Sequence, residues 1–503
     1  MSTNRAFIAA LAVLSSTLPG APACAPARAL EPTSSPPTSE LVGAPRPDPI
    51  TSGAIVDGQG DDGDSPKESS LVPWPETWPD LDLPTDAVAL APIAPDDIDE
   101  DFSNIEDLEW LRPIARDHRM VLLGESHYFR GTYWLAHRVL FALNTFDHYG
   151  VLTLEYGYWQ GPLFDHYVSL SDRDEARAFR DEVLRPVSFV EETLTLLEHI
   201  RRWNMRNPQK RIRVICHDVN HDWKAALRHV VLPYFESHDP TRAGQIDVDA
   251  LELEDLESTV AMLEGWLRSA KGYVPPDRPY LTPAHIRATL ANFAPLKWKG
   301  GPFFDEDFFA YRQEAIIRNL TDLDRAGRLV RRHKVMLWGG GYHTPTRMNL
   351  PSSARFLREG AYFSQQFEPT RGRVYSVFTG GYAYSFADVA SLDVSACEST
   401  GLRSLIESFQ EIHTDPEAPE QTTYMFQRDG FLEFVIGLAP SGPTGSKAGF
   451  IHLERVDWEA LLEGAKGDAS LEESIRYNRS ILAGHDQWVI MPRSPIVRPV
   501  CPG

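Results

Sequence analysis

Four short apolar segments recur along the chain with helical sequence between them, and this recurrence constrains the fold more than any other feature. They are "MVLL" at 120–123, "VLTL" at 151–154, "IRVIC" at 212–216 and "VMLW" at 335–338. Short apolar runs rich in β-branched residues, separated by amphipathic helices, are typical of parallel strands covered by helices. The sequence therefore predicts an α/β fold with a mainly parallel central sheet.

The remaining globular sequence adds a helical stretch and further strands. About 222–300 has a helical pattern, clearest in "LESTVAMLEGWLRSA" and "TPAHIRATLANFA", and it predicts a helical insertion that forms a lid or side subdomain. After residue 370, "GRVYSVFTGG", "FLEFVIGL" and "DQWVIMP" predict strands that complete the sheet.

The first thirty residues have the features of an export signal. Arg5 supplies a positive charge, and "AFIAALAVLSSTL" follows as an apolar stretch too short to span a membrane. We expect 1–29 to be a signal peptide, 30–104 an acidic, Pro-rich disordered linker and 105–503 the catalytic domain. The protein is then exported to a periplasmic, cell-surface or secreted location. Lipid attachment at Cys24 is an alternative that would tether it to a membrane.

The negative charge of the chain is concentrated in the predicted linker. The formal net charge is -22, and 31–107 contains 19 acids against only Arg46 and Lys67, about -17. When the charge of that segment and of the two arginines before it is subtracted, residues 108–503 have a net charge of -7. Phosphate backbones require a basic stripe, and none is visible in the sequence, so we expect a small-molecule substrate and no nucleic acid.

Cysteine usage and two absent motifs narrow the chemistry. No CxxC pair occurs, so the sequence gives no support to a cysteine metal site. A disulfide between Cys397 and Cys501 would suit an oxidising compartment, although the pairing stays open. The chain contains no GxSxG nucleophile elbow and no HExxH zinc helix.

Each of the four predicted strands is followed by acidic or histidine residues. Because the carboxyl ends of parallel strands meet at one edge of a sheet, we expect these side chains to lie close together. A single glutamate after a strand is usually a solvated turn residue, and an aspartate there can cap the next helix; four such endings favour a functional site. The residues are Glu125 and His127 after the first strand, Glu155 and Tyr156 after the second, His217 and Asp218 after the third, and His343 after the fourth.

Two predicted helices add polar side chains to this group. In "YWLAHRVLFALNTF", Arg138 lies near the apolar stripe, whereas His137 lies on the far, solvent-facing side. In "FFAYRQEAIIRNL", Arg312 and Asn319 share the face of the apolar residues. A lone buried charge is costly, so the carboxylates at the strand ends are natural partners for Arg312 and Asn319. A purely structural ion pair is the alternative for each arginine.

These segments resemble, in matching order, the motifs of erythromycin esterase-like proteins, within a wider superfamily that includes ChaN-like and TIKI-like proteins. "GESH" is similar to the GExxH opening, "VLTLEYG" to the strand ending in glutamate, "VICHD" to the GxD strand end, "YRQEAIIRN" to the RDxxMAEN helix and "VMLWGGGYHT" to the WAHNxH segment. The likeness extends loosely from about 105 to 497. The chain departs from the family in the single residue between Glu125 and His127, and in Gly340 and Gly341 where the family has His and Asn.

The resemblance implies that His127, Glu155 and His343 are the essential residues, with Arg138 approximately at the position of the family's arginine. It also implies that water opens an ester or lactone without a covalent serine intermediate. His127 would act as general base, because the pKa of histidine falls near neutral, and Glu155 would orient it. His343 and Arg138 would stabilise the oxyanion and protonate the leaving group.

The other candidate residues have supporting roles in this hypothesis. Arg312 and Asp218 would hold the catalytic groups in register. Tyr156 would form part of an apolar wall for the substrate, and Glu125, His217 and Asn319 would bind the substrate or support the site.

Two alternatives stay open at this point. A metal-dependent hydrolase, as in the TIKI-like proteins, would hold zinc, manganese or cobalt through His127, Glu125, Asp218 and His343. A haem- or ligand-binding exported protein, as the ChaN-like resemblance implies, would have no catalytic role. We favour an enzyme that needs no cofactor, and the identity of its substrate stays open.

Overall fold

The computed structural model describes most of the chain from residue 105 onward. The described ranges are 105–125, 130–188, 190–219, 223–293, 306–347 and 358–381, with shorter segments at 383–385, 422–424, 449–452, 458–464, 466–467 and parts of 472–495. Several predictions concern residues outside the described ranges: the signal peptide and the linker, the strand "FLEFVIGL", and Cys24, His127, Cys397 and Cys501. The domain boundaries at 29 and 104 therefore stay predictions.

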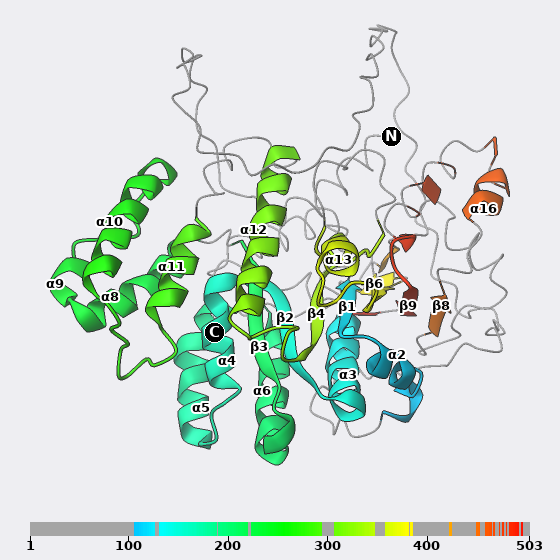
Figure 1. The fold of residues 1–503 in the computed structure, drawn as a ribbon, viewed down its shortest axis with the longest axis horizontal. Coiled ribbons are helices and arrows are strands. Elements are labelled where there is room, and N and C mark those ends of the chain that lie inside the picture. The colour runs from blue at the N-terminus through cyan, green and yellow to red at the C-terminus, as the bar shows by residue number, and fades with distance from the viewer. Residues whose placement is uncertain are drawn as a thin grey trace, which may run out of the picture. The chain divides into compact units, whose positions relative to one another are not determined.

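A seven-stranded sheet forms the centre of the fold, with the strands in the order β3-β2-β4-β1-β5-β9-β8 (Figure 1). Neighbouring strands pair in parallel except β8, which runs antiparallel to β9. In sheet order the strands are Arg213–Asp218, Tyr149–Gly157, Lys334–Gly340, Met120–Glu125, Val374–Gly381, Gln487–Met491 and Gly449–His452. A smaller sheet contains β10 (Ser494–Pro495), β6 (Ala383–Ser385) and β7 (Thr422–Tyr424). The predicted α/β fold with a mainly parallel sheet is confirmed.

Helices connect the strands and cover both faces of the sheet. They are α2 (Leu111–Asp117), α3 (Arg130–Asp147), α4 (Gly161–Tyr167), α5 (Arg173–Phe179), α6 (Glu191–Arg206), α7 (Trp223–Ala226), α8 (Leu232–His238), α9 (Pro240–Ala243), α10 (Leu256–Ser269), α11 (Pro283–Ala291), α12 (Glu306–Arg325), α13 (Glu359–Ala361) and α16 (Trp458–Gly464), with short turns such as η2 (Tyr158–Gln160) between them. Among the described residues, no helix is long and apolar enough to cross a membrane.

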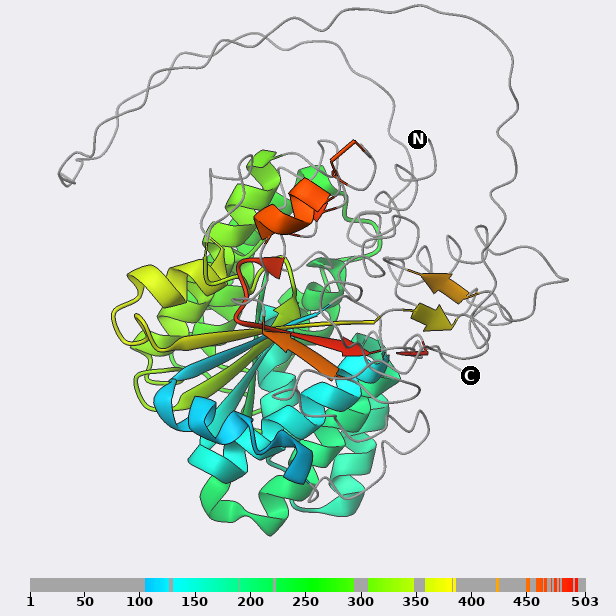
Figure 2. The ribbon, with the colours of Figure 1, turned by 90° about the vertical axis from the view of Figure 1, so that its right-hand side faces the viewer.

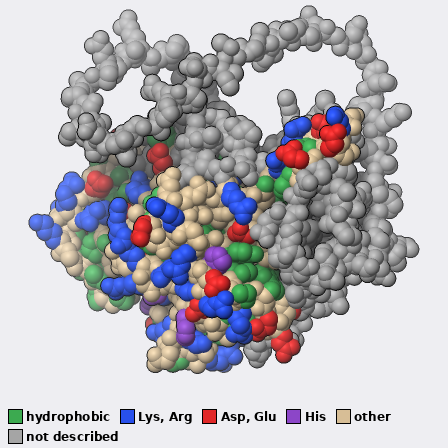
Figure 3. All heavy atoms as spheres, turned by 45° about the vertical axis from the view of Figure 1, so that its right-hand side comes forward, with side chains coloured by type: hydrophobic (Ala, Val, Ile, Leu, Met, Phe, Trp, Pro, Cys, Tyr) green, Lys and Arg blue, Asp and Glu red, His purple; other side chains and the backbone are tan. Residues whose placement is uncertain are grey.

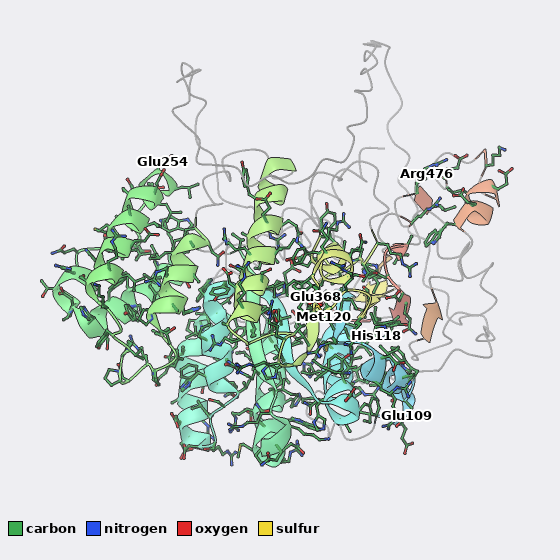
Figure 4. The ribbon with its side chains drawn as sticks, in the orientation of Figure 1. Glu109, His118, Met120, Glu254, Glu368 and Arg476 are labelled. Atoms are coloured by element: carbon green, nitrogen blue, oxygen red, sulfur yellow. The ribbon has the colours of Figure 1, made fainter. Side chains whose placement is uncertain are left out.

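Side chains alternate between two apolar layers along each central strand, as the pleat of a strand requires. In β1, Val121 and Leu123 belong to the larger cluster with α3, α4 and α6, whereas Met120 and Leu122 belong to the smaller cluster with α12. The two helical layers lie on opposite sides of the strands (Figure 2). Met120 lies in the interior, whereas Glu109 and Glu254 lie at the periphery of the described side chains (Figure 4). The continuous apolar run of β1 is thus explained by burial on both faces.

The insertion between β3 and α12 is helical, as the sequence predicts. It contains α7 to α11, and α11 begins where the Thr282 hydroxyl accepts a hydrogen bond from the backbone N–H of His285 at 3.2 Å, with a proline at the first helical position. His285 contacts the backbone oxygen of Trp159 through Nε2 at 3.2 Å. The insertion therefore packs against the β2 side of the fold, while its role as a lid stays a prediction.

Close packing behind β4 generates a prediction on stability. A Cβ atom at Gly360 would lie 2.4 Å from the backbone oxygen of Thr344 and 2.6 Å from that of Pro345, and backbone cannot move aside cheaply. We expect Gly360→Ala to lower the free energy of unfolding by about 1–3 kcal/mol, measured by urea denaturation. The control is Gly265→Ala in α10, where only ordinary contact at 3.7 Å exists and a gain of about 1 kcal/mol is expected. Equal stability of the two variants would contradict this packing.

Candidate active site

Arg312 of α12 connects two strand ends by a fork of hydrogen bonds. Its Nε and Nη2 atoms donate to Oδ1 and Oδ2 of Asp218 at 2.9 and 2.8 Å, and Nη2 also donates to Oε1 of Glu155 at 2.7 Å. Burial alone would lower the pKa of Arg312, but the two carboxylates raise it well above its ordinary value. The guanidinium therefore stays charged and holds the ends of β2 and β3 against α12.

His343 follows β4 and lies between two carboxylates. Its Nε2 is 3.2 Å from Oε1 of Glu155, and its Nδ1 is 3.1 Å from Oε1 of Glu359. Burial would lower the pKa of His343, but Glu155 and Glu359 raise it to about 10. The ring is therefore an imidazolium at neutral pH, and both of its nitrogens donate.

The two cations of the site are in direct contact. Nη1 of Arg312 lies 3.3 Å from Nε2 of His343. Both nitrogens carry protons, so they are two donors and do not form a hydrogen bond with each other. Nε2 of His343 donates to Glu155 instead. Such a pair of cations is costly unless carboxylates surround it, and Glu155, Asp218 and Glu359 supply three negative charges around the two cations.

The glycines after β4 make room for Glu155. A Cβ atom at Gly339 would lie 2.9 Å from Oε2 of Glu155, and the backbone N–H of Gly340 donates a hydrogen bond to that same oxygen. The pairing of β2 with β3 is irregular between Leu154 and Gly157, where Glu155 stands. The absence of a side chain at Gly339 thus lets the backbone of β4 approach the Glu155 carboxylate closely.

His217 and Asn319 support the same edge of the sheet. Nδ1 of His217 lies 2.7 Å from the hydroxyl of Thr153, and the side-chain amide of Asn319 donates to the His217 backbone oxygen at 3.0 Å. Nε2 of His217 is buried and has no hydrogen-bond partner among the residues that the structure describes. Burial lowers the pKa of His217, although Glu359, Glu155 and Asp218 oppose this shift, so the ring is neutral beside the charged group.

Glu125 and Tyr156 belong to the opposite face of the sheet. Oε2 of Glu125 accepts a hydrogen bond from Nε1 of Trp338 at 2.8 Å, and the Tyr156 hydroxyl lies 2.6 Å from that of Thr193. Trp338 and Tyr156 both belong to the apolar cluster of the α3 layer. The strand ends therefore present polar groups to both faces, because Glu125 points away from the face that carries Arg312.

The structure does not bring Arg138 into the group of Arg312 and His343. Both terminal nitrogens of Arg138 bond the carboxylate of Asp107, and its guanidinium lies 4.7 Å from the centre of the Trp134 ring. Of the two readings of this arginine, the structural ion pair is the one that the geometry supports. The helix pattern could not reveal this partner, because Asp107 lies 31 residues away.

The prediction that His137 faces solvent was wrong. His137 is wholly buried, and its Nδ1 lies 3.2 Å from Nδ1 of His199 in α6. Residues 130–144 of α3 are all buried, and only its last three residues are partly or fully exposed, so a single apolar stripe does not describe its packing. A second helix covers the side that the pattern assigned to water.

The sequence did not predict four residues: two that contact His343 and a buried ion pair at the start of α3. Glu359 and Gln313 contact Nδ1 of His343 at 3.2 and 3.3 Å, and Arg130 at the start of α3 pairs with the buried Glu192 at 3.1 Å. Gln313 follows Arg312 directly, but Glu359 stands in no motif. Its signal exists only in three dimensions, where a buried imidazolium requires a second carboxylate.

Comparisons with known proteins leave the family of the chain open. No family profile and no curated protein sequence matches it. Three solved structures are similar to the chain. A Bacillus cereus protein shares 16% identity over 82% of this chain and 96% of that chain, with a TM-score of 0.47, and a succinoglycan biosynthesis protein shares 13% identity over 82% of this chain and 95% of that chain, with a TM-score of 0.48. A mutant of erythromycin esterase EreC in its open conformation shares 13% identity over 78% of this chain and 94% of that chain, with a TM-score of 0.45.

The charge on His343 generates a prediction on stability. Its pKa in the folded protein, about 10, exceeds the ordinary value of 6.5, so its stabilising contribution is complete below pH 6.5 and is lost as the pH rises to about 10. We expect the difference in unfolding free energy between the wild type and His343→Gln to shrink over that range, as measured by urea denaturation. His238→Gln, at an exposed histidine, serves as the control. A difference that is constant or grows with pH would contradict the assignment.

Proposed function

We propose that this protein is a hydrolase that cleaves an ester or lactone bond with activated water. One observation carries the proposal: Arg312 and His343 form a buried pair of cations, 3.3 Å apart, at the carboxyl edge of a parallel sheet. Ligands of open α/β sheets bind at this edge. Preorganised donors in a water-poor site stabilise the negative charge that develops in acyl transfer.

His343 supplies charge and a proton in this mechanism. Its imidazolium attracts the oxyanion that forms when water adds to the carbonyl carbon. When the carbon–oxygen bond breaks, the leaving alkoxide is a stronger base than imidazole, so transfer of the Nε2 proton to it is favourable. Glu155, which accepts from Nε2 in the resting site at 3.2 Å, stabilises the imidazolium between turnovers.

Arg312 positions these groups and takes the oxyanion role that the sequence assigned to Arg138. Its bonds to Asp218 and Glu155 occupy Nε and Nη2, while Nη1 is directed at His343. A fixed guanidinium beside the imidazolium strengthens the positive field without rearrangement during the reaction. Asp218 thereby acts through Arg312 and is a positioning residue.

Activation of water is assigned to His127 as a proposal from the sequence. β1 ends at Glu125, two residues before His127, and pairs there with Gly340 of β4, the strand that leads to His343. A histidine with a pKa near neutral can accept a proton from water. His343 cannot take this role at neutral pH, because its ring already carries both protons.

Metal-dependent hydrolysis and haem binding stay alternatives that experiment separates from this proposal. Among the described residues, no group of three or more His, Cys, Asp or Glu is arranged to hold a metal ion, and the predicted set includes His127. A metal requirement would appear as activity that a chelator removes and a divalent ion restores. Haem binding would appear as a Soret band on titration.

The test is a panel of ester, lactone and amide substrates, assayed with and without chelator. We expect hydrolysis of at least one ester or lactone, and a fall in kcat of about 10²-fold or more for Glu155→Gln, His343→Gln and His127→Ala. Glu254→Gln and His238→Gln, at exposed positions, should retain wild-type rates, and circular dichroism should confirm folding of every variant. Wild-type turnover in both Glu155→Gln and His343→Gln would sink the proposal.

A further inference from the structure

A cleft of about 930 Å³ runs along the outer edge of the sheet, beside β3. One end lies at the amino ends of the strands, where His148, Arg213 and Lys334 line it, and the other end reaches Tyr280 and His285 near α11. β3 is the terminal strand of the sheet. The cleft therefore follows β3 from Arg213 to Cys216.

The lining of this cleft is strongly basic. Among the residues that the structure describes, its lining includes seven Lys or Arg side chains and two acids, whereas 108–503 carries a net charge of -7. Asp165 pairs with Arg213 and Asp147 with Lys334, each at 2.6 Å. An excess of five positive charges stands out in a chain that is otherwise acidic.

Five cations of the cleft have no acidic partner among the residues that the structure describes: Arg119, which donates to the backbone oxygen of Val330, and Lys210, Arg211, Arg328 and Arg332. Arg211, Arg328 and Arg332 are exposed, and Figure 3 shows Lys and Arg side chains over much of one face of the described residues. Unpaired arginines on the wall of a cleft are available to an anionic ligand, which they can bind through two parallel N–H donors.

Arginines of the cleft influence the pKa values of two residues in its wall. Burial lowers the pKa of His333, and Arg213 and Arg332 lower it further. Burial raises the pKa of Tyr158, and Arg328 opposes this shift. His333 and Tyr158 both line the cleft, so these arginines lie close enough to influence two residues of its wall.

Aromatic rings line the part of the cleft next to these cations. The rings of Tyr158 and His285 stack at 5.4 Å with 20° between their planes, and His166 and Tyr280 lie 4.5 Å apart at 31°. All four residues line the cleft. Such faces can pack against a sugar or a base, so the site combines a charged end with a flat apolar wall.

We propose that this cleft binds a small phosphorylated ligand, with its phosphate on Arg328 and Arg332 and its ring against Tyr158 and Tyr280. A phosphate dianion matches several guanidinium groups better than a single carboxylate does. Asp218, Arg312 and His343 do not line this cleft. The cleft is therefore a second site, and its occupancy does not depend on the proposed hydrolysis.

Calorimetric titration of the full chain tests this proposal, with inorganic phosphate, a nucleoside diphosphate and glucose 1-phosphate as probes in low salt. We expect saturable binding of at least one organic phosphate, weakened tenfold or more in Arg328→Ala/Arg332→Ala. The control is Arg268→Ala/Arg325→Ala, which removes two exposed arginines outside the cleft and should leave affinity unchanged. Thermal denaturation verifies that both double variants fold.

The outcomes distinguish which organic phosphate the cleft prefers, and whether the cleft is separate from the proposed catalytic site. Preference for the nucleoside diphosphate or for glucose 1-phosphate supports the cleft and identifies the scaffold that it accepts. Unchanged ester hydrolysis in Arg328→Ala/Arg332→Ala, together with lost binding, supports a site separate from catalysis. No saturable binding of any probe, or equal binding by both double variants, would overturn the proposal.

Discussion

The guanidinium of Arg312 is a positive charge in the interior, where an unpaired charge would be costly. Two carboxylates form ion pairs with it. Asp218 and Glu155 come from neighbouring strands, β3 and β2, and Arg312 comes from the helix that covers them. One side chain thus fixes two strands and a helix at the carboxyl edge of the sheet. The position of His343 depends on this arrangement, because its ring shares Oε1 of Glu155 with Arg312.

The pleat of the strands decides which polar groups can act together. Glu155 and His217 face the α12 layer with Thr153, whereas Glu125 and Tyr156 face the α3 layer. Strand ends that look equivalent in sequence therefore supply two different environments, one with paired cations and one with tyrosine and tryptophan. The proposed chemistry uses the first environment, and the second lies on the opposite face of the sheet.

Much of the fold and part of the site could be predicted from the sequence. The apolar runs gave β1 to β4 in parallel because burial on both faces leaves a continuous signature, and the face shared by Arg312 and Asn319 was correct because helical spacing determines it. Glu359 could not be predicted, since its contact with His343 depends on tertiary packing. Arg138 was assigned to the site although its partner is Asp107, because a pattern on one helix does not reveal what the next element offers.

A double-mutant cycle on Glu155→Gln and Asp218→Asn tests the central role of Arg312 most directly. Each single variant leaves the buried guanidinium one carboxylate, and the double variant leaves it none. We expect the double variant to lose about 1–3 kcal/mol more unfolding free energy than the sum of the single losses, and this excess to vanish in an Arg312→Met background. Losses that add within about 0.5 kcal/mol in the wild-type background would contradict the account.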